Sequence, residues 1–210
     1  DKSNLVLKDI SFDIKKGEKV AVLGRVGSGK STLVNCINRY NEIPKGSIYI
    51  DGKDVTSITK KALRSVVRTV TQEPFLFSDT LKNNIEFGAD EHGYLQTMTQ
   101  VLKQSAMDKE VANFSDGLNT MVGEKGILLS GGQKQRISLA RGIYSSSKLL
   151  ILDNVLSAVD NETERFLLDQ LLAPENALSC LIVSHRQAVL ERVDKILVMD
   201  EGRIVAIGSH

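Results

Sequence analysis

This sequence of 210 residues has few cysteines, almost no net charge and no long apolar run. Its two cysteines, Cys36 and Cys180, stand far apart and without a metal-binding spacing, which favours a reduced cytosolic setting over a disulfide scaffold. The net charge of +1 lacks the basic surplus of a nucleic-acid-binding surface, so we expect no nucleic-acid partner. No apolar run approaches the ~18 residues of a membrane helix, and no signal peptide opens the chain.

The remaining composition is that of an ordinary globular domain, with 41% hydrophobic and 25% charged residues. The length allows one large domain, or one domain with a subdomain, around a buried core. The chain starts at Asp1 without a methionine and stops at His210. We therefore expect it to be a piece of a longer protein.

Apolar periodicity near the start of the chain predicts two strands. Ile10, Phe12 and Ile14 recur at every second residue, which predicts a strand that a turn at Lys16-Gly17 closes. The run Lys19–Gly24 is short and largely apolar, as in a strand that is buried on both faces.

Two hairpins and a helical block follow. Ser47–Val55 predicts a hairpin that turns at Asp51-Gly52, and a last hairpin is predicted to turn at Glu201-Gly202. The spacing of apolar residues becomes helical between about 79 and 144. Strand character returns in three segments: Leu149–Leu152, Leu181–Val183 and Ile196–Met199. The pattern predicts an α/β fold, in which a helical block interrupts a sheet core.

A glycine-rich stretch joins a predicted strand to a predicted helix and fits the pattern G-x-x-x-x-G-K-[ST] of phosphate-binding loops. Phosphates need backbone N–H groups with no side chains in the way, and a helix N-terminus favours their negative charge. Lys30 would reach the β- and γ-phosphates of a nucleotide, and the Ser31 hydroxyl would hold Mg²⁺. The predicted nucleotide site comprises Gly24, Arg25, Val26, Gly27, Ser28, Gly29, Lys30, Ser31 and Thr32.

A carboxylate stands at the end of another predicted strand. The run Leu149–Leu152 leads directly into Asp153, and ligands of open parallel sheets lie at the carboxyl ends of the strands. On its own, such a carboxylate more often caps a turn or a helix. Beside a phosphate-binding loop, we predict that Asp153 binds Mg²⁺ through water.

The stretch LLSGGQKQR, Leu128 to Arg136, resembles the LSGGQ signature of ATP-binding cassette (ABC) proteins, and it precedes Asp153 at the family's usual distance. Physically it is a capped helix start, which presents free N–H groups and a positive dipole end to an anion. In the family this surface binds the γ-phosphate of ATP held by a second cassette, so that the nucleotide is sandwiched between two domains. The resemblance implies ATP and Mg²⁺ as cofactors, a second cassette as partner, and a signature formed by Ser130, Gly131, Gly132 and Gln133.

Further positions match the family one by one. Gln72 in VTQEP looks like the glutamine that contacts Mg²⁺ and senses the membrane domain. SAVD resembles the D-loop that crosses the dimer interface, with Ser157 and Asp160 at its ends. His185 in LIVSHR is similar to the switch histidine that touches the γ-phosphate. The resemblance covers essentially the whole chain.

Two segments narrow the resemblance to exporters. Gln72–Ile85 resembles the exporter segment that meets the coupling helices of a membrane domain. Met121–Gly126, just before the signature, looks like the exporter X-loop, with Glu124 at its charged position. The resemblance therefore implies a cassette at the cytoplasmic face of a membrane, and its membrane domain would lie outside this chain. The aromatic residue that stacks on adenine in the family would precede Leu5 by several positions.

The resemblance also implies an organisation. We expect a single domain over residues 1–210, with a P-loop NTPase core, an antiparallel β-subdomain and an inserted α-helical subdomain that carries the signature. Residues 1–72 and 147–210 would form the catalytic core, and residues 73–146 the helical subdomain.

Asn154 departs from the family pattern. The family has glutamate after the strand aspartate, where it polarises the attacking water, and Val155 and Leu156 differ from the pattern too. An amide can hold that water but cannot take its proton. General-base assistance contributes ~10²–10⁴-fold, so we predict slow turnover at this site. Because three adjacent positions differ, natural degeneracy is favoured over an engineered change. The pattern is similar to heterodimeric exporters, in which one site hydrolyses ATP and the other mainly holds it.

Three functions stay open on the sequence. The first is the nucleotide-binding domain of a heterodimeric ABC exporter, with an ATPase site that is degenerate. The second is a regulatory cassette without hydrolysis in either site, which a partner that also lacks the glutamate would favour. The third is a chromosome-maintenance ABC ATPase, which needs long coiled-coil heptads between the phosphate loop and the signature. No such heptads occur here.

Overall fold

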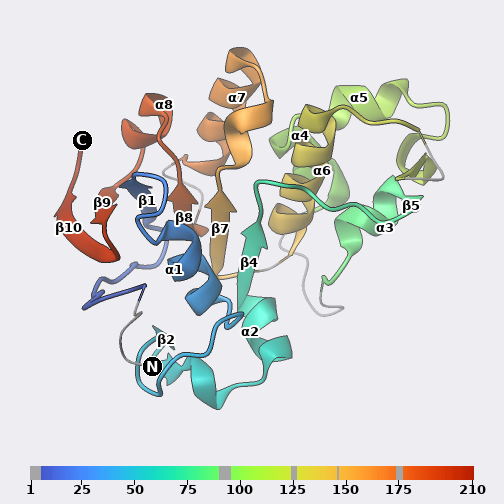
Figure 1. Cartoon of the computed structure of the whole chain (residues 1–210). Helices are drawn as coiled ribbons and strands as arrows, with labels where there is room; N and C mark the ends of the chain where they lie inside the picture. Colours follow the sequence, from blue (N-terminus) through green and yellow to red (C-terminus); the bar gives the residue numbers. More distant parts are fainter. Residues whose placement is uncertain (1–5, 90–95, 124–126, 146, 174–176) are drawn as a thin grey trace.

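A computed structural model describes residues 6–89, 96–123, 127–145, 147–173 and 177–210 (Figure 1). Its centre is a six-stranded sheet in the order β10-β9-β1-β8-β7-β4. Neighbouring strands are parallel throughout, except that β10 runs antiparallel to β9. The strands are β1 (Lys19–Gly24), β4 (Val67–Val70), β7 (Leu149–Asp153), β8 (Ser179–Val183), β9 (Lys195–Asp200) and β10 (Arg203–Gly208).

Burial of both sheet faces explains the continuous apolar runs. In β1, Val20 and Val22 pack with α1 (Lys30–Ile37) on one face, and Ala21 packs with α6 (Gly131–Tyr144) and α7 (Asn161–Leu171) on the other. All three side chains are fully buried. Parallel strands covered on both faces read as unbroken apolar sequence because neither face meets water. The strands predicted within 19–24, 149–152, 181–183 and 196–199 are confirmed.

The helices flank the sheet, and those between β5 and β7 gather at its β4 side (Figure 1). Several begin at a Thr, Ser or Asp whose side chain caps the first turn, as at Thr97 and Ser130. The helical block predicted between 79 and 144 is confirmed, with two short strands inside it. The helices are α1 (Lys30–Ile37), α2 (Lys60–Val66), α3 (Leu81–Glu86), α4 (Met98–Gln104), α5 (Asp108–Asn113), α6 (Gly131–Tyr144), α7 (Asn161–Leu171) and α8 (Gln187–Leu190).

Both predicted hairpins are present. β2 (Tyr49–Ile50) and β3 (Lys53–Asp54) turn at Asp51-Gly52, and β9 and β10 turn at Glu201-Gly202. A further antiparallel pair joins β5 (Asp79–Thr80) to β6 (Met121–Val122). Single 3₁₀ turns complete the elements: η2 (Val55–Ser57), η3 (Gly117–Asn119) and η4 (Val155–Ala158).

The strand predicted at Ile10, Phe12 and Ile14 is wrong. These side chains do alternate with exposed neighbours and pack against the apolar cluster under α1. Within the described residues, however, no strand pairs with this segment. Alternation of apolar and polar residues indicates which face of an extended segment is buried. A β-strand also needs a neighbouring strand to hydrogen-bond with. The turn at Lys16-Gly17 is confirmed.

None of the described helices combines the length and the apolar character that crossing a bilayer requires.

Candidate functional site

The phosphate loop (Gly24–Thr32) connects β1 to α1 and is shaped by close approaches that leave no room for side chains. A Cβ added at Gly24 would stand 2.3 Å from the carbonyl oxygen of Met199 in β9 and 2.6 Å from the Ser28 hydroxyl. Gly29, just before α1, has a φ of 102°, in the region that favours glycine. The Gly202 amide of the β9–β10 turn also donates to the Ser28 carbonyl, at 3.0 Å. The sheet and this turn therefore fix the shape of the loop.

Lys30 lies folded within the loop. Its Nζ donates to the carbonyl oxygens of Gly24 and Arg25, both at 2.7 Å. Burial lowers the pKa of Lys30, and the negative charge of Asp153 opposes this shift. Burial likewise raises the pKa of Asp153, and the Lys30 charge opposes that shift. The ammonium and the carboxylate thus act on each other across the end of the sheet.

The predicted site residues outside the signature and the D-loop follow neighbouring strands at one edge of the sheet. Four adjacent parallel strands, in the order β1-β8-β7-β4, end at this edge because parallel strands share a direction. The phosphate loop follows β1, His185 follows β8, and Asp153 with Asn154 ends β7. Gln72 lies two residues beyond β4. His185, Gln72 and Ser31 are solvent-exposed, so they are accessible from this edge.

The donor set fits a nucleotide with Mg²⁺. The loop packs so closely on β9 and the Gly202 turn that side chains are excluded at Gly24 and Gly29, and glycine-rich loops of this kind leave backbone N–H groups free for phosphates. Mg²⁺ usually keeps several waters and takes one or two carboxylates plus substrate phosphates, so the Asp153 carboxylate and the Ser31 hydroxyl suffice. Among the described residues, no group of three or more His, Cys, Asp and Glu is placed to hold a metal.

Asn154 has a left-handed backbone, with φ 53° and ψ 36°. Its amide donates to the carbonyl of Val183 in β8 at 3.0 Å, and its carbonyl accepts from the Ser157 hydroxyl at 3.1 Å. Asparagine is enriched several-fold in this conformation among residues other than glycine. The residue at the base position is therefore fixed at the strand end, and its identity suits its backbone.

The signature (Ser130–Gln133) forms the N-terminus of α6. The Ser130 hydroxyl accepts from the Gln133 amide and the Gln133 side chain accepts from the Ser130 amide, which is a capping box. A Cβ added at Gly132 would lie 2.9 Å from the carbonyl oxygen of Ala158, whereas one at Gly131 would meet nothing within 4 Å. The structure thus places the signature against the D-loop (Ser157–Asp160). None of the hydrogen bonds of the described residues joins it to the phosphate loop.

Asp160 caps α7. Its carboxylate accepts from the amides of Glu162 and Thr163 and from the Thr163 hydroxyl, at 3.1, 2.9 and 2.7 Å. The hydrogen bonds from Thr163 lead the causes that hold the pKa of Asp160 below its usual value. Asp160 therefore has a structural role in this chain, in addition to the interface role that the resemblance implies.

The two segments predicted to meet a membrane domain lie side by side. β5 of one pairs with β6 of the other, and a Cβ added at Gly123 would stand 3.0 Å from the Cα of Ser78. Phe75, with 66% of its surface exposed, and Phe87, with 53%, give this region an aromatic surface. Glu124 and the rest of Met121–Gly126 beyond Gly123 lie outside the described residues.

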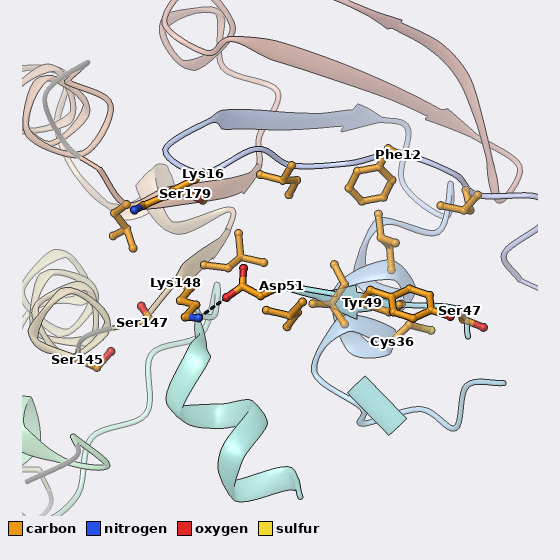
Figure 2. Close-up of a pocket in the computed structure, with 18 of the residues that line it drawn as sticks. Phe12, Lys16, Cys36, Ser47, Tyr49, Asp51, Ser145, Ser147, Lys148 and Ser179 are labelled. Carbon is orange, nitrogen blue, oxygen red and sulfur yellow. Dashed lines mark hydrogen bonds and ion pairs between the residues drawn. The ribbon is translucent and has the colours of Figure 1, made fainter. Parts of the chain in front are cut away.

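A cavity of about 1610 Å³ lies elsewhere among the described residues. It opens between the segment 10–16, the β2–β3 hairpin and the side of α1 that carries Cys36, and it shares only Thr32 with the phosphate loop. Figure 2 shows Phe12 and Tyr49 facing each other across it, and the ion pair of Lys148 with Asp51 between Tyr49 and Ser147. Its lining is largely apolar, so we assign it no part in phosphate chemistry.

Comparison with known proteins decides the family. The model of the family described as ABC transporter matches residues 7–157, which is more than half of the chain. The chain belongs to the ABC transporter family. The cassette is 43% identical over 208 residues to an ATP-dependent lipid A-core flippase of Pseudomonas fluorescens, covering 98% of the chain and 34% of that protein. It is 39% identical over 204 residues to the flippase of the same name from Idiomarina loihiensis, covering 97% of the chain and 35% of that protein.

A solved structure agrees. A bacterial Atm1-family ABC exporter with ATP bound superposes on the whole cassette with a TM-score of 0.89 and 34% identity, and the cassette covers 37% of that chain. The chain thus spans about a third of the length of its relatives. The expected fold class, a P-loop NTPase α/β domain, is confirmed, and so is an exporter-type cassette.

Sequence reasoning missed the residues that join α6 to the aromatic surface. Arg141 and Gln135 of α6 bind carbonyl oxygens of the chain before α3. The sequence does not indicate which distant carbonyl an arginine or a glutamine of a helix will bind. These side chains and carbonyls become neighbours only in the folded chain.

One prediction tests the packing of the phosphate loop. Gly24→Ala is expected to lower the free energy of unfolding by about 1–3 kcal/mol, because its Cβ would overlap the Met199 carbonyl, a backbone atom. Denaturant unfolding measures this. Gly131→Ala is the matched control, since the added Cβ meets nothing and alanine favours a helix. Equal stability of Gly24→Ala and the unchanged chain would contradict the close approach.

Proposed function

We propose that this chain is the nucleotide-binding domain of a heterodimeric ABC exporter. The site that contains its own phosphate loop would bind Mg-ATP and hydrolyse it slowly. The single observation that carries the proposal is Asn154 at the base position, beside an otherwise complete set of site residues at one sheet edge. Its relatives are named as flippases and exporters, which supports export across a membrane by the whole protein.

Each residue has a part in the proposed site. Amides of the phosphate loop and the charge of Lys30 hold the phosphates, while Ser31, Gln72 and Asp153 hold Mg²⁺. The metal would neutralise charge on the β- and γ-phosphates. His185 approaches the γ-phosphate from the end of β8. Asn154 positions water by a hydrogen bond but accepts no proton from it, because an amide is not a base at neutral pH.

The proposed assembly places a second, non-identical cassette against this one. The signature (Ser130–Gln133) would bind the γ-phosphate in the partner's site, where an intact glutamate would support hydrolysis. Ser157 and Asp160 of the D-loop would lie at the interface. The close approach of Ala158 and Val159, which lie between them, to Gly132 supports a surface shared with the signature. A membrane domain would contact the paired segments Gln72–Ile85 and Met121–Gly126, at the cytoplasmic face of the membrane.

We also propose the division within the cassette. Residues 1–72 and 147–210 contribute all strands of the central sheet, which supports their assignment as catalytic core. Residues 73–146 contribute α3 to α6, which supports a helical subdomain.

The chain is expected to bind Mg-ATP while releasing phosphate very slowly. Its phosphate cradle is complete, whereas Asn154 supplies none of the ~10²–10⁴-fold that a general base contributes. Equilibrium titration with ATP and steady-state phosphate release measure the two properties. Lys30→Ala serves as the control that should weaken binding. Brisk hydrolysis by the purified chain would contradict the proposal.

A further inference from the structure

Arg141 connects the signature helix to the aromatic surface. It lies in the last turn of α6, and its Nη1 donates to the carbonyl of Phe75 at 2.9 Å. Its Nε donates to the carbonyl of Asn84 at 2.7 Å, and its Nη2 donates to the Asn84 side chain at 3.1 Å. The guanidinium also lies 5.7 Å from the ring centre of Phe77 and 5.9 Å from that of Phe87, within cation–π range.

Asn84 extends this connection through the turn before α3. It is fully buried, and its side chain accepts from the amide of Phe77 at 2.9 Å. It also donates to the carbonyls of Phe77 and Thr80, both at 3.0 Å. Satisfied buried polar networks of this kind are rigid because breaking one bond leaves its partners unpaired. The guanidinium of Arg141 therefore binds a segment, Phe75 to Asn84, that this network already holds in one conformation.

Gln135 makes a second connection from the same helix. Its side chain, almost fully buried, donates to the carbonyl of Thr71 at 3.2 Å. Gln135 and Arg141 are six residues apart, about 9 Å along the helix axis. The stretch Thr71–Phe75 is thus held to α6 at both ends by side chains that bind its backbone, while Gln72 between them stays exposed.

The permanent charge of Arg141 strengthens its hydrogen bonds to Phe75 and Asn84. Burial lowers the pKa of the guanidinium, and the neighbouring charge of Arg68 lowers it further. Arginine nevertheless keeps its proton in proteins, and its planar fork offers donors in fixed directions. A half-buried permanent charge with three acceptors holds its geometry more firmly than a neutral side chain does.

We propose that Gln135 and Arg141 are positioning residues that make the segment Thr71–Phe87 move together with the signature helix. Displacement of the signature would then carry Gln72 and the exposed rings of Phe75 and Phe87 with it. This rests on the proposed function, in which the signature binds the partner's ATP and the aromatic surface contacts a membrane domain. The geometry of the connection stands on the hydrogen bonds above.

The test compares two replacements with one matched control. Arg141→Lys keeps the charge but replaces the fork with a single ammonium that cannot align with all three acceptors. Arg141→Met keeps most of the apolar stem and removes every bond. Arg136→Met is the control, because Arg136 is half-buried on the same helix, as Arg141 is, but binds Glu110 and the carbonyl of Ala106 instead.

Hydrogen exchange of the whole chain gives the first readout. In Arg141→Lys we expect amides of 75–87 to exchange at least about tenfold faster, the factor that a lost hydrogen bond from a charged donor represents. Amides of β8 should not change. Arg136→Met should instead accelerate exchange around α5. Unchanged exchange at 75–87 in Arg141→Lys would overturn the inference. If Arg141→Met does not fold, Arg141→Lys still decides it.

The second readout is the ratio of substrate-stimulated to basal ATP hydrolysis in the assembled transporter at saturating ATP. We expect Arg141→Lys to keep the basal rate of ATP hydrolysis and the KM for ATP, and to lose the stimulation by substrate. This pattern is discriminating, since a variant that merely destabilised the domain would lower the basal rate as well. Arg136→Met should keep the ratio. Full stimulation in Arg141→Lys, while Gly132→Asp abolishes turnover, would overturn the inference and leave the proposed function standing. Unimpaired turnover in Gly132→Asp would instead overturn the proposed function.

Discussion

Gly132→Asp in this chain is expected to abolish most ATP hydrolysis of the assembled transporter, and Lys30→Ala is expected to leave the larger residual rate. The aspartate would place a negative charge at the N-terminus of α6, where the γ-phosphate of the partner's ATP would bind, and oppose the helix dipole. Loss of such preorganised stabilisation costs ~10²–10³-fold in turnover. Its Cβ would also crowd the carbonyl of Ala158, at 2.9 Å. Lys30→Ala affects the site that, in the proposed function, already lacks its base.

The measurement is steady-state ATPase activity of both variants in the full heterodimer. Gly132→Asn is the matched control, since it has nearly the volume of aspartate without the charge and should retain more activity. If Lys30→Ala proves as damaging as Gly132→Asp, the asymmetric roles of the two sites are wrong. If Gly132→Asn is as inactive as Gly132→Asp, the contact with Ala158 rather than the charge explains the loss.

Asn154→Glu is expected to raise hydrolysis at this cassette's own site by about tenfold, a part of the ~10²–10⁴-fold that general-base assistance supplies. A carboxylate can take the proton that the amide cannot. Recovery stays partial because the left-handed backbone of this position, with φ 53°, disfavours glutamate by about 1 kcal/mol relative to asparagine. In addition, buried Val155 and Leu156 fix the turn that follows.

Phosphate release in an assembly with an intact facing signature measures this gain. Asn154→Gln is the control, because it has the length and the backbone cost of glutamate but no basic group. A rise in Asn154→Glu alone assigns the defect to the missing base. An unchanged rate in Asn154→Glu, with ATP still bound, would mean that the base is not the sole defect.

The central sheet and the phosphate loop could be predicted because each leaves a pattern in contiguous sequence. A strand buried on both faces must be apolar throughout, as β1 and β8 are, and the loop fits a known glycine pattern, although Met199, which excludes a side chain at Gly24, is distant in sequence. Their convergence at one edge follows from parallel strands. The sequence therefore led to the family before any contact was known.

Contacts between distant segments could not be predicted. The segment with Ile10 and Phe12 has the alternation of a strand, but periodicity carries no information about a hydrogen-bonding neighbour. Arg141 binds Phe75 and Asn84, which are 66 and 57 residues away in sequence. The approach of Gly132 to Ala158 is equally invisible in the pattern, because glycine is required there by a neighbour rather than by its own backbone.

The phosphate loop rests on Met199 and on the Gly202 turn, and this has a thermodynamic consequence for nucleotide affinity. Ordering a free loop on binding costs about 1–2 kcal/mol of backbone entropy per residue. Here contacts with β9 and the Gly202 turn order the loop when the chain folds, so that this entropy is lost before a nucleotide binds. In the function proposed above, little of the free energy of ATP binding would therefore be spent on ordering the loop, which favours long retention of ATP at a site that hydrolyses it slowly.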